Sequence, residues 1–132
     1  MKPPIEMIRV SKQGKDQLSK LRRQTGIEHW NVLCRWAFCV SLKEKTPPTL
    51  FNQKLDGGVE MTWKVFAGEQ SEIFAALIWM RAREDEFPRT TEGVANCLRA
   101  HLHRGLTYLP SGKDTRSLPD LVARWFTFNA GD

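Results

Sequence analysis

The segment WNVLCRWAFCVSL, residues 30–42, constrains the fold more than any other part of the chain. It has the composition of a helix with apolar residues on nearly all of its sides, where an ordinary surface helix has one apolar stripe. Such a helix must be surrounded by protein, either by the rest of its own domain or with help from a neighbouring subunit. Arg35 interrupts the apolar residues, and it must reach solvent or find a partner because an unpaired buried charge is costly.

The length of 132 residues predicts one domain, which at this size forms a core without disulfides or metal. We expect a single domain over 1–132, with a basic strand–helix–helix segment at 1–45 and a helical remainder at 46–132. A charged fraction of 27% beside 41% hydrophobic residues excludes wholesale disorder. No apolar run approaches the roughly 20 residues of a membrane span. The opening sequence MKPPIEMIRV has no apolar signal region, so we expect a cytoplasmic protein.

The cysteines are consistent with a cytoplasmic protein. Cys34, Cys39 and Cys97 lie in apolar segments and show no metal-type pairing, so we expect buried, reduced thiols.

The first third of the chain predicts a short strand over residues 5–10 and a helix over 12–24, with Ser11 as its N-cap. One narrow apolar stripe of this helix consists of Gly14, Leu18, Leu21 and Thr25. Two readings of the following turn remain open. Gly26 can end the helix in a left-handed cap, or Thr25 and Glu28 can form a capping box for the next helix.

The remainder of the chain predicts three more helices and a possible second strand. Apolar residues alternate from Val59 to Val65, which is a strand period. A helix over about 71–85 places Ile73, Phe74, Leu77, Ile78 and Trp79 on its inner face. Another helix begins at Thr91, a loop covers 109–117, and a last helix begins at Pro119. The fold class is therefore mainly α, with one or two short strands.

The positive charge is concentrated at one end. Residues 1–45 contain ten Lys or Arg and four Asp or Glu, while residues 46–132 contain ten and eleven. The bland explanation is a solvated helix face, but the segregation favours a polyanionic partner, and basic residues without interleaved aromatic residues favour phosphate contacts. We expect the contacts from Lys12, Lys15, Lys20, Arg22 and Arg23, with Arg9, Lys43 and Lys45 as secondary candidates.

Other chemistry has weaker support. His101 and His103 are two positions apart, point away from one another on a helix, and are expected to be exposed or capping residues near a helix end. Glu84, Asp85 and Glu86 can be read as magnesium ligands of a nuclease, but carboxylates from other elements would have to converge on them. We therefore predict no catalytic residue, no metal site and no cofactor.

The sequence IRVSKQGKDQLSKLRRQTGIEHWNVLCRWAFCVSL resembles the opening of the DndE family, small components of bacterial DNA sulfur-modification (phosphorothioation) systems. The basic helix, the RRQTGI turn and the segment rich in Trp and Cys carry this resemblance. It implies a DNA-binding, self-associating subunit that accompanies the sulfur-transferring partners and does not itself perform the sulfur chemistry. The strand–helix–Gly–helix order also resembles a ribbon–helix–helix unit.

These observations lead to three functional hypotheses. The first is an accessory subunit that binds the backbone of double-stranded DNA, prefers nicked or distorted duplex, and forms a homodimer or homotetramer. The second is a protein-interaction scaffold whose basic surface meets an acidic subunit of the modification complex. The third is a metal-dependent nuclease.

Overall fold

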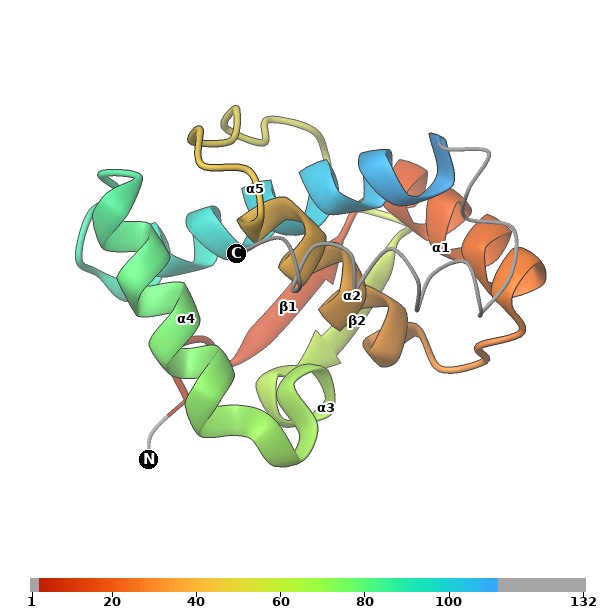
Figure 1. The fold of residues 1–132 in the computed structure, drawn as a ribbon, viewed down its shortest axis with the longest axis horizontal. Coiled ribbons are helices and arrows are strands. Elements are labelled where there is room, and N and C mark those ends of the chain that lie inside the picture. The colour runs from red at the N-terminus through yellow and green to blue at the C-terminus, as the bar shows by residue number, and fades with distance from the viewer. Residues whose placement is uncertain (1–2, 112–132) are drawn as a thin grey trace.

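The structure is a computed structural model that describes residues 3–111 of the chain. Its elements are β1 Met7–Val10, α1 Lys12–Thr25, α2 Trp30–Leu42, β2 Val59–Thr62, α3 Trp63–Ala67, a 3₁₀ turn Gly68–Gln70, α4 Ser71–Glu84 and α5 Thr91–Ser111 (Figure 1). The fold is mainly helical with one small sheet, as the sequence predicts. Within the described range, every helix is too short or too polar to traverse a bilayer.

β1 and β2 form a two-stranded antiparallel sheet, although α1, α2 and a long loop separate them in the sequence. The register places Ile8 opposite Met61 and Val10 opposite Val59. Ile8, Val10 and Met61 are buried, so the sheet turns one face to the core. Gly58 is required before β2, because a Cβ at that position would lie 1.7 Å from the Val10 carbonyl oxygen.

α2 lies at the centre of the molecule and contacts α1, α3 and α5 (Figure 1). None of its residues is exposed, which confirms the prediction of a surrounded helix. α5 passes close to it at Gly105, where a Cβ would lie 1.8 Å from the Ala37 carbonyl oxygen. Arg35 donates from Nη1 to the Phe66 carbonyl oxygen at 2.6 Å, so its charge finds a backbone partner.

The turn between α1 and α2 decides between the two predicted roles of Gly26, as the C-cap of α1 or as the first residue of the next helix. Gly26 is in the left-handed conformation with φ 78°, and its N–H donates to the Arg22 carbonyl oxygen. The Thr25 hydroxyl donates to the Leu21 carbonyl oxygen and accepts from the Ile27 N–H. The capping-box alternative is therefore wrong, because Thr25 is the last residue of α1 and not the cap of the next helix.

The second strand is shorter than the alternating pattern predicts. The Thr62 hydroxyl accepts a hydrogen bond from the Val65 N–H and caps α3. The strand therefore ends at Thr62, and Trp63 and Val65 are helical. Trp63 remains buried in the helix, whereas Val65 is exposed.

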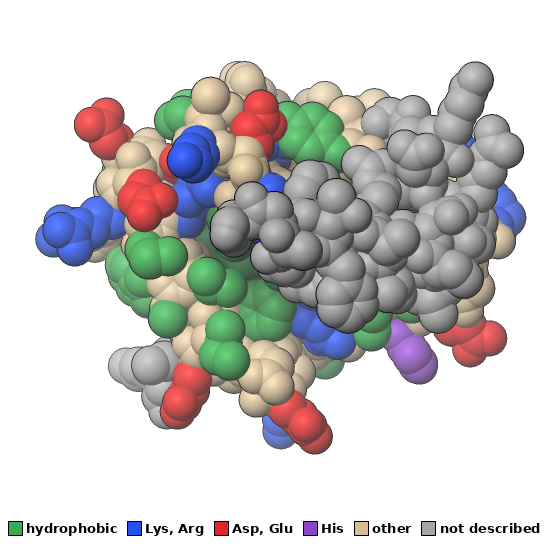
Figure 2. All heavy atoms as spheres, in the orientation of Figure 1, with side chains coloured by type: hydrophobic (Ala, Val, Ile, Leu, Met, Phe, Trp, Pro, Cys, Tyr) green, Lys and Arg blue, Asp and Glu red, His purple; other side chains and the backbone are tan. Residues whose placement is uncertain are grey.

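α4 buries only part of the predicted face: Phe74 and Ile78 are buried and Leu77 is half-buried, but Ile73 and Trp79 are not. Ile73 and Trp79 are 57% and 43% exposed, and Figure 2 shows hydrophobic side chains gathered over this helix. The prediction is wrong for these two residues because α4 is apolar on both sides, so periodicity alone does not decide which side meets the core. The buried residues are Phe74, Ala75, Ile78, Arg81 and Ala82.

α5 extends further than the sequence predicts. It begins at Thr91, as expected, and continues to Ser111, so the first residues of the predicted loop at 109–117 are helical. The rest of that loop and the helix predicted from Pro119 lie outside the described residues.

Candidate nucleic-acid interface

α1 is held against the rest of the fold by its first turn. The Ser11 Oγ accepts from the Gly14 N–H at 3.0 Å, which confirms the predicted N-cap. The Ser11 N–H donates to Nε2 of His103 on α5 at 3.0 Å. A Cβ at Gly14 would lie 3.4 Å from Leu106 Cδ1 and only 2.4 Å from Val10 Cγ1, so the helix packs closely here. The predicted stripe of Gly14, Leu18, Leu21 and Thr25 is the buried face of α1.

The remaining sides of α1 carry the five basic residues that the sequence predicts as phosphate contacts. We call them the basic surface of α1: Lys12, Lys15, Lys20, Arg22 and Arg23. All are exposed except Lys15, which is half-buried. Lys15 Nζ and Arg22 Cζ lie 6.0 and 5.2 Å from the centre of the Trp30 ring, so this ring holds both cations by cation–π contacts. In residues 3–111, no carboxylate forms an ion pair with any of the five.

The three secondary candidates come from other elements. Arg9 on β1 pairs through Nε with Glu60 Oε1 on β2 at 2.7 Å, so part of its charge is neutralised on the protein. Lys43 is half-buried and Lys45 is exposed, both directly after α2. The strongest uncompensated positive charge of the described chain is therefore on α1.

The three adjacent carboxylates do not converge. Glu84 and Glu86 are exposed, whereas the side chain of Asp85 is only 2% exposed. Arg81 Nε donates to both Asp85 oxygens at 3.1 Å, and His101 Nε2 lies 2.7 Å from Asp85 Oδ2. Asp85 therefore points inward while its neighbours point outward, which is not the arrangement that a two-metal nuclease needs.

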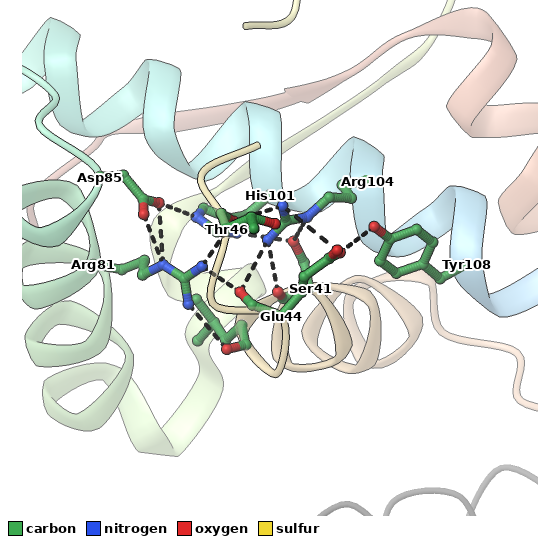
Figure 3. Close-up of polar contacts among 9 residues, drawn as sticks. Ser41, Glu44, Thr46, Arg81, Asp85, His101, Arg104 and Tyr108 are labelled. Carbon is green, nitrogen blue, oxygen red and sulfur yellow. Dashed lines mark hydrogen bonds and ion pairs between the residues drawn. The ribbon is translucent and has the colours of Figure 1, made fainter. Parts of the chain in front are cut away.

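Asp85 belongs to a buried polar network that joins α2, α4 and α5 (Figure 3). Ser41 Oγ lies 2.8 Å from His101 Nδ1 and accepts from Arg104 Nε at 2.8 Å. Burial lowers the pKa of His101 to about 4, against the opposing effect of Asp85. The imidazole is thus neutral: Nδ1 accepts the Ser41 O–H, and Nε2–H donates to Asp85.

This order of hydroxyl, imidazole and carboxylate is that of a nucleophile, a base and an orienting acid. However, Ser41 and His101 are completely buried, and Arg104 already occupies the Ser41 oxygen. The three groups therefore join elements of the fold and do not face a substrate. The prediction of an exposed or capping His101 near a helix end is wrong, because α5 is longer than expected and this residue lies in its middle.

Two arginines extend the network to the backbone after α2. Arg81 donates from Nη1 to the Leu42 carbonyl oxygen at 2.9 Å, and from Nη2 to the carbonyl oxygens of Glu44 and Thr46. Arg104 donates to the same Thr46 oxygen at 2.8 Å and to the Ser41 carbonyl oxygen at 2.9 Å. These bonds fix the start of the loop between α2 and β2. The sequence feature that hinted at this network was the position of the charged Arg81 within an apolar helix.

Asp85, Cys97 and His101 place one potential metal-ligating atom each within 4.8 Å of the others. Sequence reasoning missed this group, although Cys97 and His101 are at helical i, i+4 spacing. The donor atoms are already in use, since Arg81 occupies both Asp85 oxygens and Ser41 and Asp85 occupy the His101 nitrogens. Burial, with a smaller effect of Asp85, raises the pKa of the Cys97 thiol to about 12. The hydrogen-bonded network therefore suits these residues better than a metal ion does.

Comparison with known proteins identifies the family of this chain. The family model described as "DNA sulphur modification protein DndE" matches residues 7–117. The chain belongs to the DndE family. The match runs from β1 into α5 and beyond, so the basic surface of α1 and the buried network both lie inside it. It confirms the resemblance that residues 8–42 carry.

Solved DndE structures have the same fold. A crystal structure of DndE from Escherichia coli B7A, involved in DNA phosphorothioation modification, matches with a TM-score of 0.67 and 24% identity, covering 79% of this chain and 97% of that one. A crystal structure of a DndE G21/24K mutant, involved in DNA phosphorothioation, matches with a TM-score of 0.60 and 21% identity, covering 77% and 94%. No curated protein matches the chain.

Proposed function

We propose that this protein is a DNA-binding accessory subunit of a DNA phosphorothioation system and contacts the duplex backbone through the basic surface of α1. The observation that carries the proposal is the set of five cations on the sides of α1 that do not face the core, none of which forms an ion pair with a carboxylate among residues 3–111. Membership of the DndE family and the DNA-modification systems named for its solved members support the same role. Lys and Arg supply many of the phosphate contacts in protein–DNA complexes, and such contacts position the protein on the duplex without reading its sequence.

The physical basis is the release of counterions from DNA. Five phosphate contacts give a slope of about −4.5 when log affinity is plotted against log salt concentration. A surface that senses backbone position favours duplexes whose backbone can adapt, so we expect tighter binding to nicked or distorted duplex. A homodimer or homotetramer would present several such surfaces at once and raise the affinity through effective concentration.

We further propose that the protein is not itself the sulfur-transfer enzyme or a nuclease. Burial raises the pKa of the Cys34 thiol to about 12 and that of the half-buried Cys39 thiol to about 11, so neither forms a nucleophilic thiolate readily. The outward direction of Glu84 and Glu86 supports the proposal that the protein is not a nuclease. Supercoiled plasmid should remain intact with magnesium or manganese, and its nicking would contradict this.

The binding proposal is tested by reversing three charges of the basic surface. A variant with Lys12→Glu, Lys20→Glu and Arg23→Glu should bind duplex at least about a hundredfold more weakly at 0.1 M salt, and its salt slope should fall to about −2. The matched control reverses three exposed cations of α3, α4 and the segment after it: Lys64→Glu, Arg83→Glu and Arg89→Glu. α4 lies on the opposite side of the molecule from α1, and α3 lies at the lower centre (Figure 1).

Fluorescence anisotropy with intact and nicked duplexes gives the affinities, and circular dichroism confirms that both variants fold. The proposal predicts a large loss for the α1 variant and a small one for the control. Equal losses of affinity in the two variants would show that only net charge matters. Unchanged binding of the α1 variant would show that the DNA-binding site is not on α1.

One observation favours a second function as a scaffold for another subunit of the modification complex. α4 exposes three large apolar side chains, Ile73, Trp79 and Met80, and exposed apolar patches mark protein–protein interaction sites. In this alternative the basic surface of α1 meets an acidic protein. Absence of binding to any duplex, together with co-purification of a modification subunit, would favour the scaffold over the DNA-binding role.

A further inference from the structure

A cleft with a volume of about 490 Å³ lies between α1, α5 and the loop that joins α2 to β2. Its size is that of a site for a small organic group. α1 contributes Gln13 and Gln17, the loop contributes residues 49–53, and α5 contributes the floor, which includes His103 and Arg104. The cleft adjoins the buried network through Arg104, whereas Ser41, Asp85 and His101 do not line it.

The walls of this cleft are rich in carboxamides. Gln13, Gln17, Asn52 and Gln53 line it, and in residues 3–111 none of these four side chains has a hydrogen-bond partner on the protein. Each carboxamide offers two donors and an acceptor. Among the described residues that line the cleft, none is a carboxylate. The matching ligand is therefore uncharged and carries donors and acceptors along one edge.

One wall is aromatic and flat. The Phe51 and His103 rings stack with their centres 3.8 Å apart at an angle of 20°. His103 is held as a neutral ring, because Nε2 accepts from the Ser11 N–H and Nδ1–H donates to the Arg99 carbonyl oxygen at 2.8 Å. Burial lowers the pKa of His103, which keeps it neutral. Such a wall suits the face of another planar ring.

Arg104, the one charged side chain among the described residues of the lining, is already engaged. The Arg104 guanidinium donates to Ser41 and Thr46, so it holds the loop and is not free for a phosphate. The free cations lie outside the cleft on the same helix that supplies Gln13 and Gln17. Gln17 is one helical turn from Lys20, and Gln13 is next to Lys12.

We propose that this cleft binds one unpaired nucleobase of the DNA whose backbone the basic surface of α1 contacts. This inference rests on the proposed function and adds a base-binding site to it. Nucleobases are planar, uncharged, and carry donors and acceptors along one edge, as the lining requires. A base beside a nick or at a frayed end leaves the stack at lower cost than one inside intact duplex, which gives a physical reason for a preference for nicked DNA.

The test compares two nicked duplexes with equal numbers of phosphates. One carries an unpaired thymidine at the nick, and the other carries an abasic residue at the same position. Their backbone charge is the same, so the affinity ratio reports the base alone. We expect the thymidine duplex to bind about tenfold more tightly, in line with the contribution of one stacked base.

The matched variants separate the cleft from the basic surface. Gln17→Ala with Asn52→Ala should reduce the ratio to about one and leave the affinity for intact duplex unchanged. Gln70→Ala, at an exposed amide outside the cleft, should preserve the tenfold ratio. Equal binding of the two probes by the native protein would overturn the base site while backbone binding stands. A tenfold ratio retained in the Gln17/Asn52 variant would also overturn it, and binding to neither probe would overturn the proposed function itself.

Discussion

The substitution Gly105→Ala tests the central helix packing most directly. It adds one methyl group where α5 passes close to α2. The added Cβ would lie 1.8 Å from the Ala37 carbonyl oxygen and 2.4 Å from its carbonyl carbon. Ordinary contact begins near 3.4 Å, so the shortfall is about 1.6 Å. The obstacle is backbone, which cannot move aside as the end of a flexible side chain can.

Two opposing effects set the magnitude. Alanine favours a helix over glycine by about 1 kcal/mol, so an unobstructed site would gain stability. Overpacking of a core costs about 1–3 kcal/mol and sometimes more, and separating two backbones belongs at the upper end of that range. We expect the free energy of unfolding to fall by about 2 kcal/mol. At roughly 4 °C per kcal/mol for a domain of this size, the melting temperature should fall by about 8 °C.

Urea unfolding followed by tryptophan fluorescence and far-ultraviolet circular dichroism measures this change. The matched control is Thr107→Ala on the exposed side of the same helix, which should change the free energy by less than about 0.5 kcal/mol. A Gly105→Ala protein as stable as the native one, or more stable, would show that the two helices do not approach as closely as described.

Two further predictions concern buried titratable groups. Unfolded His101 binds a proton below its ordinary pKa of 6.5, but the folded pKa of about 4 excludes the proton, so acid favours unfolding between these values. The free energy of unfolding should fall by about 2 kcal/mol from pH 7 to pH 5, and urea titrations that show no change over this range would contradict it. Burial raises the pKa of the Cys34, Cys39 and Cys97 thiols to about 12, 11 and 12, so iodoacetamide at pH 8 should label them slowly until urea is added. Fast labelling of the native protein would refute that burial, and Cys39 should react first.

Local signals in the sequence were sufficient for the first third of the fold. Ser11 marks the start of α1 and the apolar stripe after it predicts the buried face, whereas the end at Gly26 was one of two alternatives that the structure decided. The apolar segment 30–42 coincides with α2, although the sequence left open a start of this helix at Gly26. These predictions succeeded because each rests on residues within one or two helical turns.

Long-range polar contacts could not be predicted in the same way. The buried network joins Ser41, Asp85 and His101 from three helices, and no local pattern distinguishes Asp85 from its two exposed neighbours. The amide-lined cleft has the same origin, since its walls come from three distant segments. The basic surface of α1 was predictable because all five of its residues share one helix.

The pairing of β1 with β2 determines when in folding the basic helix takes its place. Val10 and Val59 meet only after the chain between them has closed into a loop, and loop closure of this length is entropically slow. The start of α1 also depends on His103, far along the chain, which accepts the Ser11 N–H. We therefore expect the basic residues of α1 to be exposed on a segment that has not yet packed against the rest of the fold until α5 has been synthesised. An interaction that requires α1 in its native position would then become possible only when the domain is complete.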